Sequence, residues 1–131
     1  MKRDMDLVRK ILLMFESEET WPINPEGQIN GFSKSQIDYH VELMKDSELL
    51  ESVFDTHTIT SGMRRRVDKI FRGYRLTWQG HDFLDAARDD TRWTKAKGIM
   101  TKIGGGTLEI LKDILKQVMA DQVKQVMGIQ S

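Results

Sequence analysis

The 131-residue chain has no cysteine, only two prolines and three histidines, and no long apolar run. Without cysteine it has no disulfide framework, thiol nucleophile or thiolate metal site. No apolar stretch approaches the roughly 20 residues that a membrane helix needs. The opening MKRDMDLVRK is charged and lacks the apolar segment of a signal peptide. From these absences we expect a soluble, cytoplasmic protein with no membrane partner.

Residue patterns for catalysis and cofactor binding are also missing. The histidines, His40, His57 and His81, do not fall at His-x-x-x-His or HExxH spacing, which argues against a zinc site. His81 and Asp82 are adjacent, and adjacent residues of a helix point in different directions. Gly104–Gly106 lacks the lysine and the preceding strand of a phosphate-binding loop. We therefore expect no catalytic residues, metal or cofactor, and a protein that is not an enzyme.

Charge is balanced overall but unevenly distributed. The chain has 20 basic and 20 acidic side chains, so no net field draws it to nucleic acid. Residues 1–48 hold 6 basic and 10 acidic side chains, and residues 79–131 hold 8 and 7. Residues 49–78 hold 6 basic and 3 acidic ones, which makes them the only clearly basic segment.

The N-terminal third predicts two helices. Apolar residues recur at three- and four-residue steps over Asp4–Glu16, which indicates an amphipathic helix. The proline-containing WPINPEG that follows predicts a connector, and Gln28–Phe32 is a candidate short strand. Ser33-x-x-Gln36 fits a capping box at the start of the second helix.

The basic segment predicts a hairpin. Leu50, Val53 and Phe54 suit a strand, and Ile70–Thr77 is β-prone. We expect a loop over Thr56–Met63, followed by the charged Arg64–Lys69. The predicted structure is thus two strands joined by a long, basic loop.

The C-terminal half predicts two more helices. Thr77 is the expected N-cap of the first, whose buried stripe would include Phe83, Leu84, Ala87 and Trp93. The IGGGT segment breaks the chain, because three glycines are unfavourable inside a helix. A periodic last helix follows. The expected fold is α+β and mostly helical, a winged-helix-like domain over residues 1–103 with a glycine hinge and helical extension over 104–131.

Two stretches resemble bacterial winged-helix proteins. They are IDYHVELMKDSELL, which ends in a leucine-bearing turn, and YRLTWQGHDFLDAA, which resembles a closing "Y-x-L-T-x-x-G" strand. The turn usually holds glycine where Ser47-Glu48 stands here, and WPINPEGQINGF replaces the usual preceding helix. The opening MKRDMDLVRKIL, then YHVELM, LTWQGHDFLDAARDD and the tail of three glycines and a helix give the whole chain a second likeness. It resembles a family of short bacterial and phage-borne proteins of unknown function. This resemblance implies a bacterial or prophage setting and no chemistry.

A DNA-binding role would rest on the basic wing. Wing cations contact phosphates or the minor groove and position a protein without reading sequence. The candidate wing residues are Arg64, Arg65, Arg66, Lys69 and Arg72. The exposed face of the second helix offers Lys34, Ser35 and Tyr39 as candidate contacts. Asp38, Glu42 and Asp46 share that face and would repel phosphates, which argues against sequence reading through this helix.

The last helix allows a different role. Its stripe would either pack on the chain itself or pair with a second copy, and the candidate self-association residues are Leu108, Leu111, Leu115 and Val118. Two functions therefore remain open. One is a regulator or accessory factor that binds double-stranded DNA, and the other is a protein-interaction module, such as a phage-borne adaptor or inhibitor, with a protein partner or as a homodimer.

Overall fold

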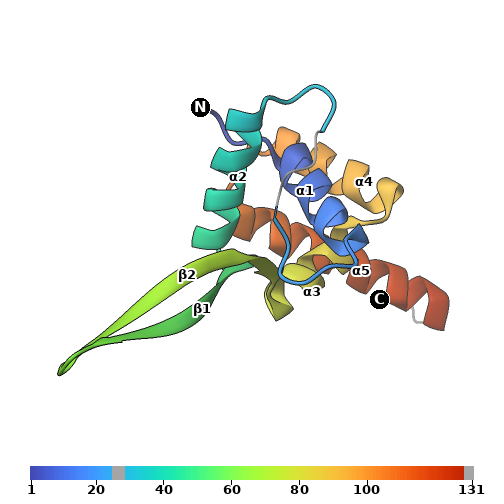
Figure 1. Ribbon diagram of the computed structural model, residues 1–131. Coiled ribbons are helices and arrows are strands. Elements are labelled where there is room, and N and C mark those ends of the chain that lie inside the picture. The colour runs from blue at the N-terminus through green and yellow to red at the C-terminus, as the bar shows by residue number, and fades with distance from the viewer. Residues whose placement is uncertain (25–28, 129–131) are drawn as a thin grey trace. The chain divides into compact units, whose positions relative to one another are not determined.

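The computed structural model describes residues 1–24 and 29–128 and confirms a mostly helical α+β fold (Figure 1). Two compact units divide the chain, Met1–Gly80 and His81–Ser131. The expected division at Gly104 stays a prediction. In chain order the elements are α1 (Met5–Ser17), α2 (Lys34–Asp46), β1 (Leu50–Ser61), β2 (Arg64–Leu76), α3 (Trp78–Ala87), α4 (Asp90–Lys102) and α5 (Leu108–Met127).

Helix α1 begins at an aspartate cap and buries one face. The Asp4 carboxylate accepts hydrogen bonds from the backbone amides of Asp6 and Leu7, which would otherwise lack partners. The buried residues follow the predicted stripe: Leu7, Val8, Ile11, Leu12 and Phe15. Fully burying each such side chain contributes about 1.5–3 kcal/mol.

Helix α2 begins with the predicted capping box. The Ser33 hydroxyl accepts from the Gln36 amide at 3.2 Å, and the Gln36 side chain accepts from the Ser33 amide at 2.8 Å. His40 is buried and joins α2 to the start of α1. Its Nδ1 donates to the Gln36 carbonyl at 2.7 Å, and its Nε2 accepts from the Asp4 amide at 2.8 Å. This histidine is therefore a structural residue.

The end of α2 explains the missing glycine of the leucine-bearing turn. The Glu48 amide bonds to the Lys45 carbonyl and the Leu49 amide to the Met44 carbonyl, which is the Schellman pattern. That pattern needs a left-handed residue, and Glu48 takes it with φ 65°. Leu49 follows and is fully buried, so the turn delivers the chain into the core.

The short strand expected over Gln28–Phe32 was wrong where it can be judged. Gln28 lies outside the described residues, and Ile29–Phe32 forms a turn closed by a hydrogen bond from the Phe32 amide to the Ile29 carbonyl. The segment that adds to the sheet is Ile23, which exchanges two backbone hydrogen bonds with Tyr74 at 2.8 and 2.7 Å. Sequence reasoning missed it because the prolines on either side suggested a plain connector.

The loop expected over Thr56–Met63 was also wrong. Strand β1 continues to Ser61 and pairs antiparallel with β2 from Arg64, which leaves only Gly62 and Met63 as the turn. Gly62 has φ 63°, as the first central residue of a type II′ turn requires. Three threonines and Ile59 in this stretch favour extended backbone, so the ladder forms although the segment is polar.

The threonine and glycine of the T-x-x-G motif, Thr77 and Gly80, hold the start of α3 against the turn after α2. Thr77 caps α3, since its hydroxyl accepts from the Gly80 amide at 2.9 Å. The same hydroxyl donates to the carbonyls of Glu48 and Leu49, which ties the cap to the turn after α2. A Cβ on Gly80 would lie 2.1 Å from the Leu49 carbonyl oxygen, so only glycine fits.

The single helix expected between Thr77 and the glycines is two helices. It breaks after Ala87, and α4 restarts with Asp89 as its cap, accepting from the Arg92 amide at 2.7 Å. Trp93 is buried as expected, but it belongs to α4. Its ring packs edge-on against the Phe83 ring, with the two ring centres 6.4 Å apart. Aspartate is a favourable N-cap residue, so Asp89 starts a new helix where the apolar periodicity alone predicted one continuous helix.

The glycine break and the last helix are confirmed. Gly104 and Gly105 adopt φ of 86° and 98°, and Thr107 caps α5 by accepting from the Ile110 amide. Helix α5 packs on α4 within the second unit.

Candidate nucleic-acid interface

The hairpin of β1 and β2 is a long two-stranded ribbon of the first unit (Figure 1). From Phe54 to Arg72 every residue is exposed except Asp68, which is half-buried. Side chains alternate between the two sides of a ribbon, so the register assigns them to two faces. The Phe54 face comprises Phe54, Thr56, Thr58, Thr60, Arg65, Val67, Lys69 and Phe71, and the Asp55 face comprises Asp55, His57, Ile59, Ser61, Arg64, Arg66, Asp68 and Ile70.

The Phe54 face carries positive charge and no acid. Its cations are Arg65 and Lys69, neither of which has an acidic partner among the residues that the structure describes. The Lys69 ammonium lies 5.9 Å from the centre of the Phe54 ring, at cation–π range. Three threonine hydroxyls stand beside these cations. This face is thus a row of donors for an anion, with aromatic rings at its inner end.

Ion pairs with acidic side chains neutralise several of the other arginines of the hairpin. Arg66 pairs with Asp68 at 3.1 Å, and Arg72 pairs with Asp55 at 3.1 Å. Nearer the base, Arg75 pairs with Glu51. Each acid of the hairpin therefore has an arginine partner, while Arg64 has no acidic partner in the described part of the chain.

A β-bulge lies between the hairpin and the core. Phe54 pairs with Phe71 but Val53 pairs with Gly73, so Arg72 is the extra residue. Gly73 has φ 146°, and a Cβ there would lie 2.7 Å from the Ile23 carbonyl oxygen. The extra residue puts Phe71 and Tyr74 on the same face although they are three positions apart.

Aromatic rings continue from the bulge into the core. Ring centres are 5.8 Å apart for Phe54 and Phe71, 5.1 Å for Phe71 and Tyr74, and 6.4 Å for Tyr74 and the buried Phe15. The Tyr74 hydroxyl also donates to Glu42 of α2 at 3.1 Å. Burial, and then the nearby Glu42 carboxylate, raise the pKa of Tyr74 to about 12. This aromatic row (Phe15, Tyr74, Phe71, Phe54) holds the base of the hairpin to α1 and α2.

The α2 residues expected to make contacts are exposed. They are Lys34, Ser35 and Tyr39. Lys34 pairs with Asp38 at 2.7 Å, and Glu42 is held by Tyr74, so two of the three acids of this face are engaged locally. The same face of α2 also carries Asp46 and has no cluster of cationic side chains. The wing residues, by contrast, lie together on one exposed ribbon.

Three of the expected self-association residues lie in the interior. Leu111, Leu115 and Val118 are buried, and Leu108 is half-buried. This favours the alternative in which the predicted stripe packs on the chain itself. Exposed large apolar residues of α5 are Ile110 near its start and, later, Val123, Val126 and Met127.

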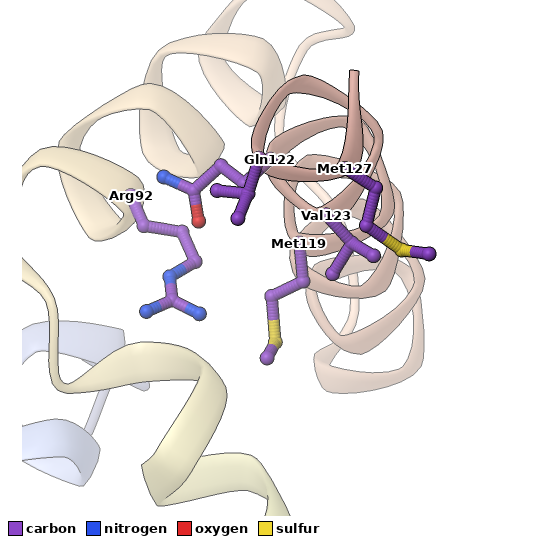
Figure 2. A pocket seen from close by; sticks show the side chains of 6 residues that line it. Arg92, Met119, Gln122, Val123 and Met127 are labelled. Carbon is purple, nitrogen blue, oxygen red and sulfur yellow. The ribbon is translucent and has the colours of Figure 1, made fainter. Parts of the chain in front are cut away.

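These later residues line an open hollow of about 220 Å³ beside α4. Figure 2 shows Arg92 of α4 across this hollow from Met119 and Val123 of α5. The Arg92 Nε is buried and has no hydrogen-bond partner among the described residues. The hollow is thus mostly apolar, with the polar side chains of Arg92 and Gln122 beside it. Sequence reasoning missed it because its two sides lie on different helices.

Two classes of feature are not found in residues 1–24 and 29–128. No group of three His, Asp or Glu side chains there is placed to hold a metal ion. No helix in the same residues is long and apolar enough to cross a membrane.

The fold and the ribbon define a small, mostly helical α+β protein with an exposed, basic β-hairpin. The chain belongs to the DUF2513 family, described as a hypothetical protein, which it matches over residues 2–107. It is also similar to an uncharacterised protein of Haemophilus influenzae, with 33% identity over 130 residues that cover 98% of this chain and 100% of the relative. The expected membership of an uncharacterised family is thus confirmed. No solved structure matches the chain, and the winged-helix assignment stays a prediction.

Proposed function

We propose that this protein binds double-stranded DNA through the β1–β2 hairpin, as a non-enzymatic regulator or accessory factor in a bacterial or phage setting. One observation supports this most directly. Arg64, Arg65 and Lys69 lie on an exposed ribbon in which each acid is already paired with another arginine. A two-stranded ribbon fits a DNA groove, and unpaired cations along it gain most from phosphate contacts.

The contacts would position the protein more than they read sequence. Arginine and lysine bound to phosphates carry no direct sequence information, and the threonines of the Phe54 face are further phosphate donors. The α2 face contributes little, because its acids would stand close to phosphates. Orientation on the duplex would come from the hairpin alone.

Fluorescence anisotropy with random-sequence duplex at two salt concentrations tests the proposal. We expect binding that weakens as the salt concentration rises. The combined variant Arg64→Ala, Arg65→Ala and Lys69→Ala should lose most of this binding. A matched control, Lys95→Ala, Lys102→Ala and Lys116→Ala, removes the same charge from exposed positions of the second unit and should bind as the parent does.

Two results would contradict DNA binding by the hairpin. One is no binding of the parent protein at low salt. The other is equal weakening by the two triple variants, which would mean that net charge and not the hairpin is responsible.

A second candidate function is protein interaction through α5. It is supported by the exposed Val126 and Met127, 88% and 66% accessible, at the rim of the hollow. If a second copy covers this end, Val123→Lys together with Val126→Lys should convert a dimer to a monomer in light scattering. A parent protein that is already monomeric would count against self-association.

A further inference from the structure

Met63 at the hairpin tip has no structural reason to be apolar. It is 104% exposed and makes up the turn together with Gly62. The turn needs glycine at its first central position because of the positive φ there, and it needs no particular side chain at the second. Polar residues are usual at such tips. A long apolar side chain at the outermost point therefore suggests a contact made outside the chain.

The surroundings of Met63 are cationic and polar. Arg64 and Arg65 follow it directly, and Thr60 and Ser61 precede the turn. The nearest acid of the hairpin along the chain, Asp68, is occupied by Arg66. An exposed apolar side chain followed by two arginines without acidic partners among the described residues is suited to insertion into a polyanion. The arginines would contact the phosphates on either side of the inserted side chain.

We propose that Met63 is a wedge that enters the minor groove of DNA and partly unstacks one base step, which bends the duplex. This inference rests on the proposed function. Proteins that bend DNA from the minor groove combine arginine contacts with an inserted apolar side chain, methionine among them, and produce kinks of about 20–90°. Methionine suits the role because its unbranched, flexible side chain adapts to a narrow gap. Twelve residues of strand span about 40 Å, so the tip stands well away from the base of the hairpin.

Energy transfer between dyes at the two ends of a short duplex measures the bend. We expect the parent protein to bring the ends closer at saturation. Met63→Ala should abolish this change and weaken binding, while the salt dependence stays as in the parent, because no phosphate contact is lost. Met63→Leu keeps an apolar wedge and should keep the bend. Met127→Ala, the same change at an exposed position of α5, is the matched control.

Four outcomes would overturn the wedge. Full bending by Met63→Ala, or salt-dependent binding by the parent without bending, removes the wedge and leaves DNA binding intact. No binding of the parent to duplex at low salt removes both proposals. A parallel titration with anionic phospholipid vesicles examines the other polyanionic surface that an apolar, cationic tip fits. Met63-dependent vesicle binding without DNA bending would assign the tip to lipid and reject the wedge.

Discussion

At the scale of single residues, Glu48 stands in place of the glycine that such a turn usually holds but adopts the backbone conformation that the turn requires. The turn after α2 needs a left-handed residue, and related turns use glycine there. Glu48 takes the same conformation with φ 65°, which costs an L-residue roughly 1–2 kcal/mol. Its side chain is exposed, so nothing in its packing offsets that cost.

Glu48→Gly should therefore raise the free energy of unfolding, by about 1 kcal/mol after the entropy cost of glycine. Urea denaturation measures it. Asp46→Gly, two positions earlier in helical backbone, is the control and should lower stability by about 1 kcal/mol. A loss of stability in Glu48→Gly would mean that its side chain has a role that its contacts do not show.

Tyr74 is the second informative residue, because it joins the hairpin to α2. In a Tyr39→Phe background it is the sole tyrosine, and its phenol absorbance should titrate at about 12 instead of the ordinary 10.0. Glu42→Gln removes the adjacent charge and should lower this pKa part of the way, since burial, the largest cause, remains. Titration at the ordinary value would mean that the Tyr74–Glu42 contact does not persist in solution.

The raised pKa has a consequence for stability in alkali. The folded state keeps the Tyr74 proton to a higher pH than the unfolded state. The stabilisation is therefore complete below pH 10 and is lost as pH rises through about 12. Tyr74→Phe has no proton to lose and should show a smaller decline over this range, and an equal decline in both proteins would contradict the assignment.

At the scale of elements, the bulge in β2 determines where the hairpin leaves the core. It needs Gly73 for two reasons, a φ of 146° and the close Ile23 carbonyl. It also gathers the rings of the aromatic row on one face. A regular ladder would put Phe71 and Tyr74 on opposite faces and would divide this row.

Gly73→Ala should lower the free energy of unfolding by about 2 kcal/mol or more, because strained backbone alone costs about 1–3 kcal/mol. Gly98→Ala is the matched control, since nothing lies within 4 Å of a Cβ placed there in helix α4. That change should raise stability by about 0.5–1 kcal/mol. Thermal or urea unfolding of the two variants gives the comparison, and equal effects would show that the bulge does not need glycine.

At the scale of the whole molecule, local signals were predictable and long-range ones were not. The Ser33 capping box, the Thr77 cap and the glycine break depend on a few neighbouring residues, and each was expected. The Ile23 bridge and the bulge depend on partners about 50 positions and about 20 positions away, which no spacing reveals. The hairpin was recognised, but its true length was missed because a polar, threonine-rich strand reads as a loop when its partner strand is unknown.

The candidate site divides in the same way. Sequence alone identified the wing cations, since a run of arginines is visible directly. It could not show that Arg66 and Arg72 are paired with acids, nor that Arg64, Arg65 and Lys69 are left without acidic partners. Those distinctions follow from the register of the two strands, which depends on the position of the turn.

The balanced charge of the whole chain bears on the proposed DNA binding. With no net field, such binding would depend on the three cations of the hairpin that lack acidic partners. Each phosphate contact contributes about 0.9 to the slope of log affinity against log salt, so we expect a slope of about 3 at most. Anisotropy over a series of salt concentrations measures it. A much steeper slope would require a basic surface beyond the hairpin.

Because the aromatic row attaches the hairpin at its base, a small rotation there produces a large displacement of the tip. The strand from the Ser52–Tyr74 pair to the turn spans about 34 Å, so a rotation of about 10° at the base would move the tip by about 6 Å, or nearly two base-pair steps. The aim of Met63 and its neighbouring arginines is thus decided far from them, where Phe15 and Tyr74 meet. A substitution such as Phe15→Leu, remote from any ligand and harmless to the charge of the hairpin, would be expected to misdirect the tip.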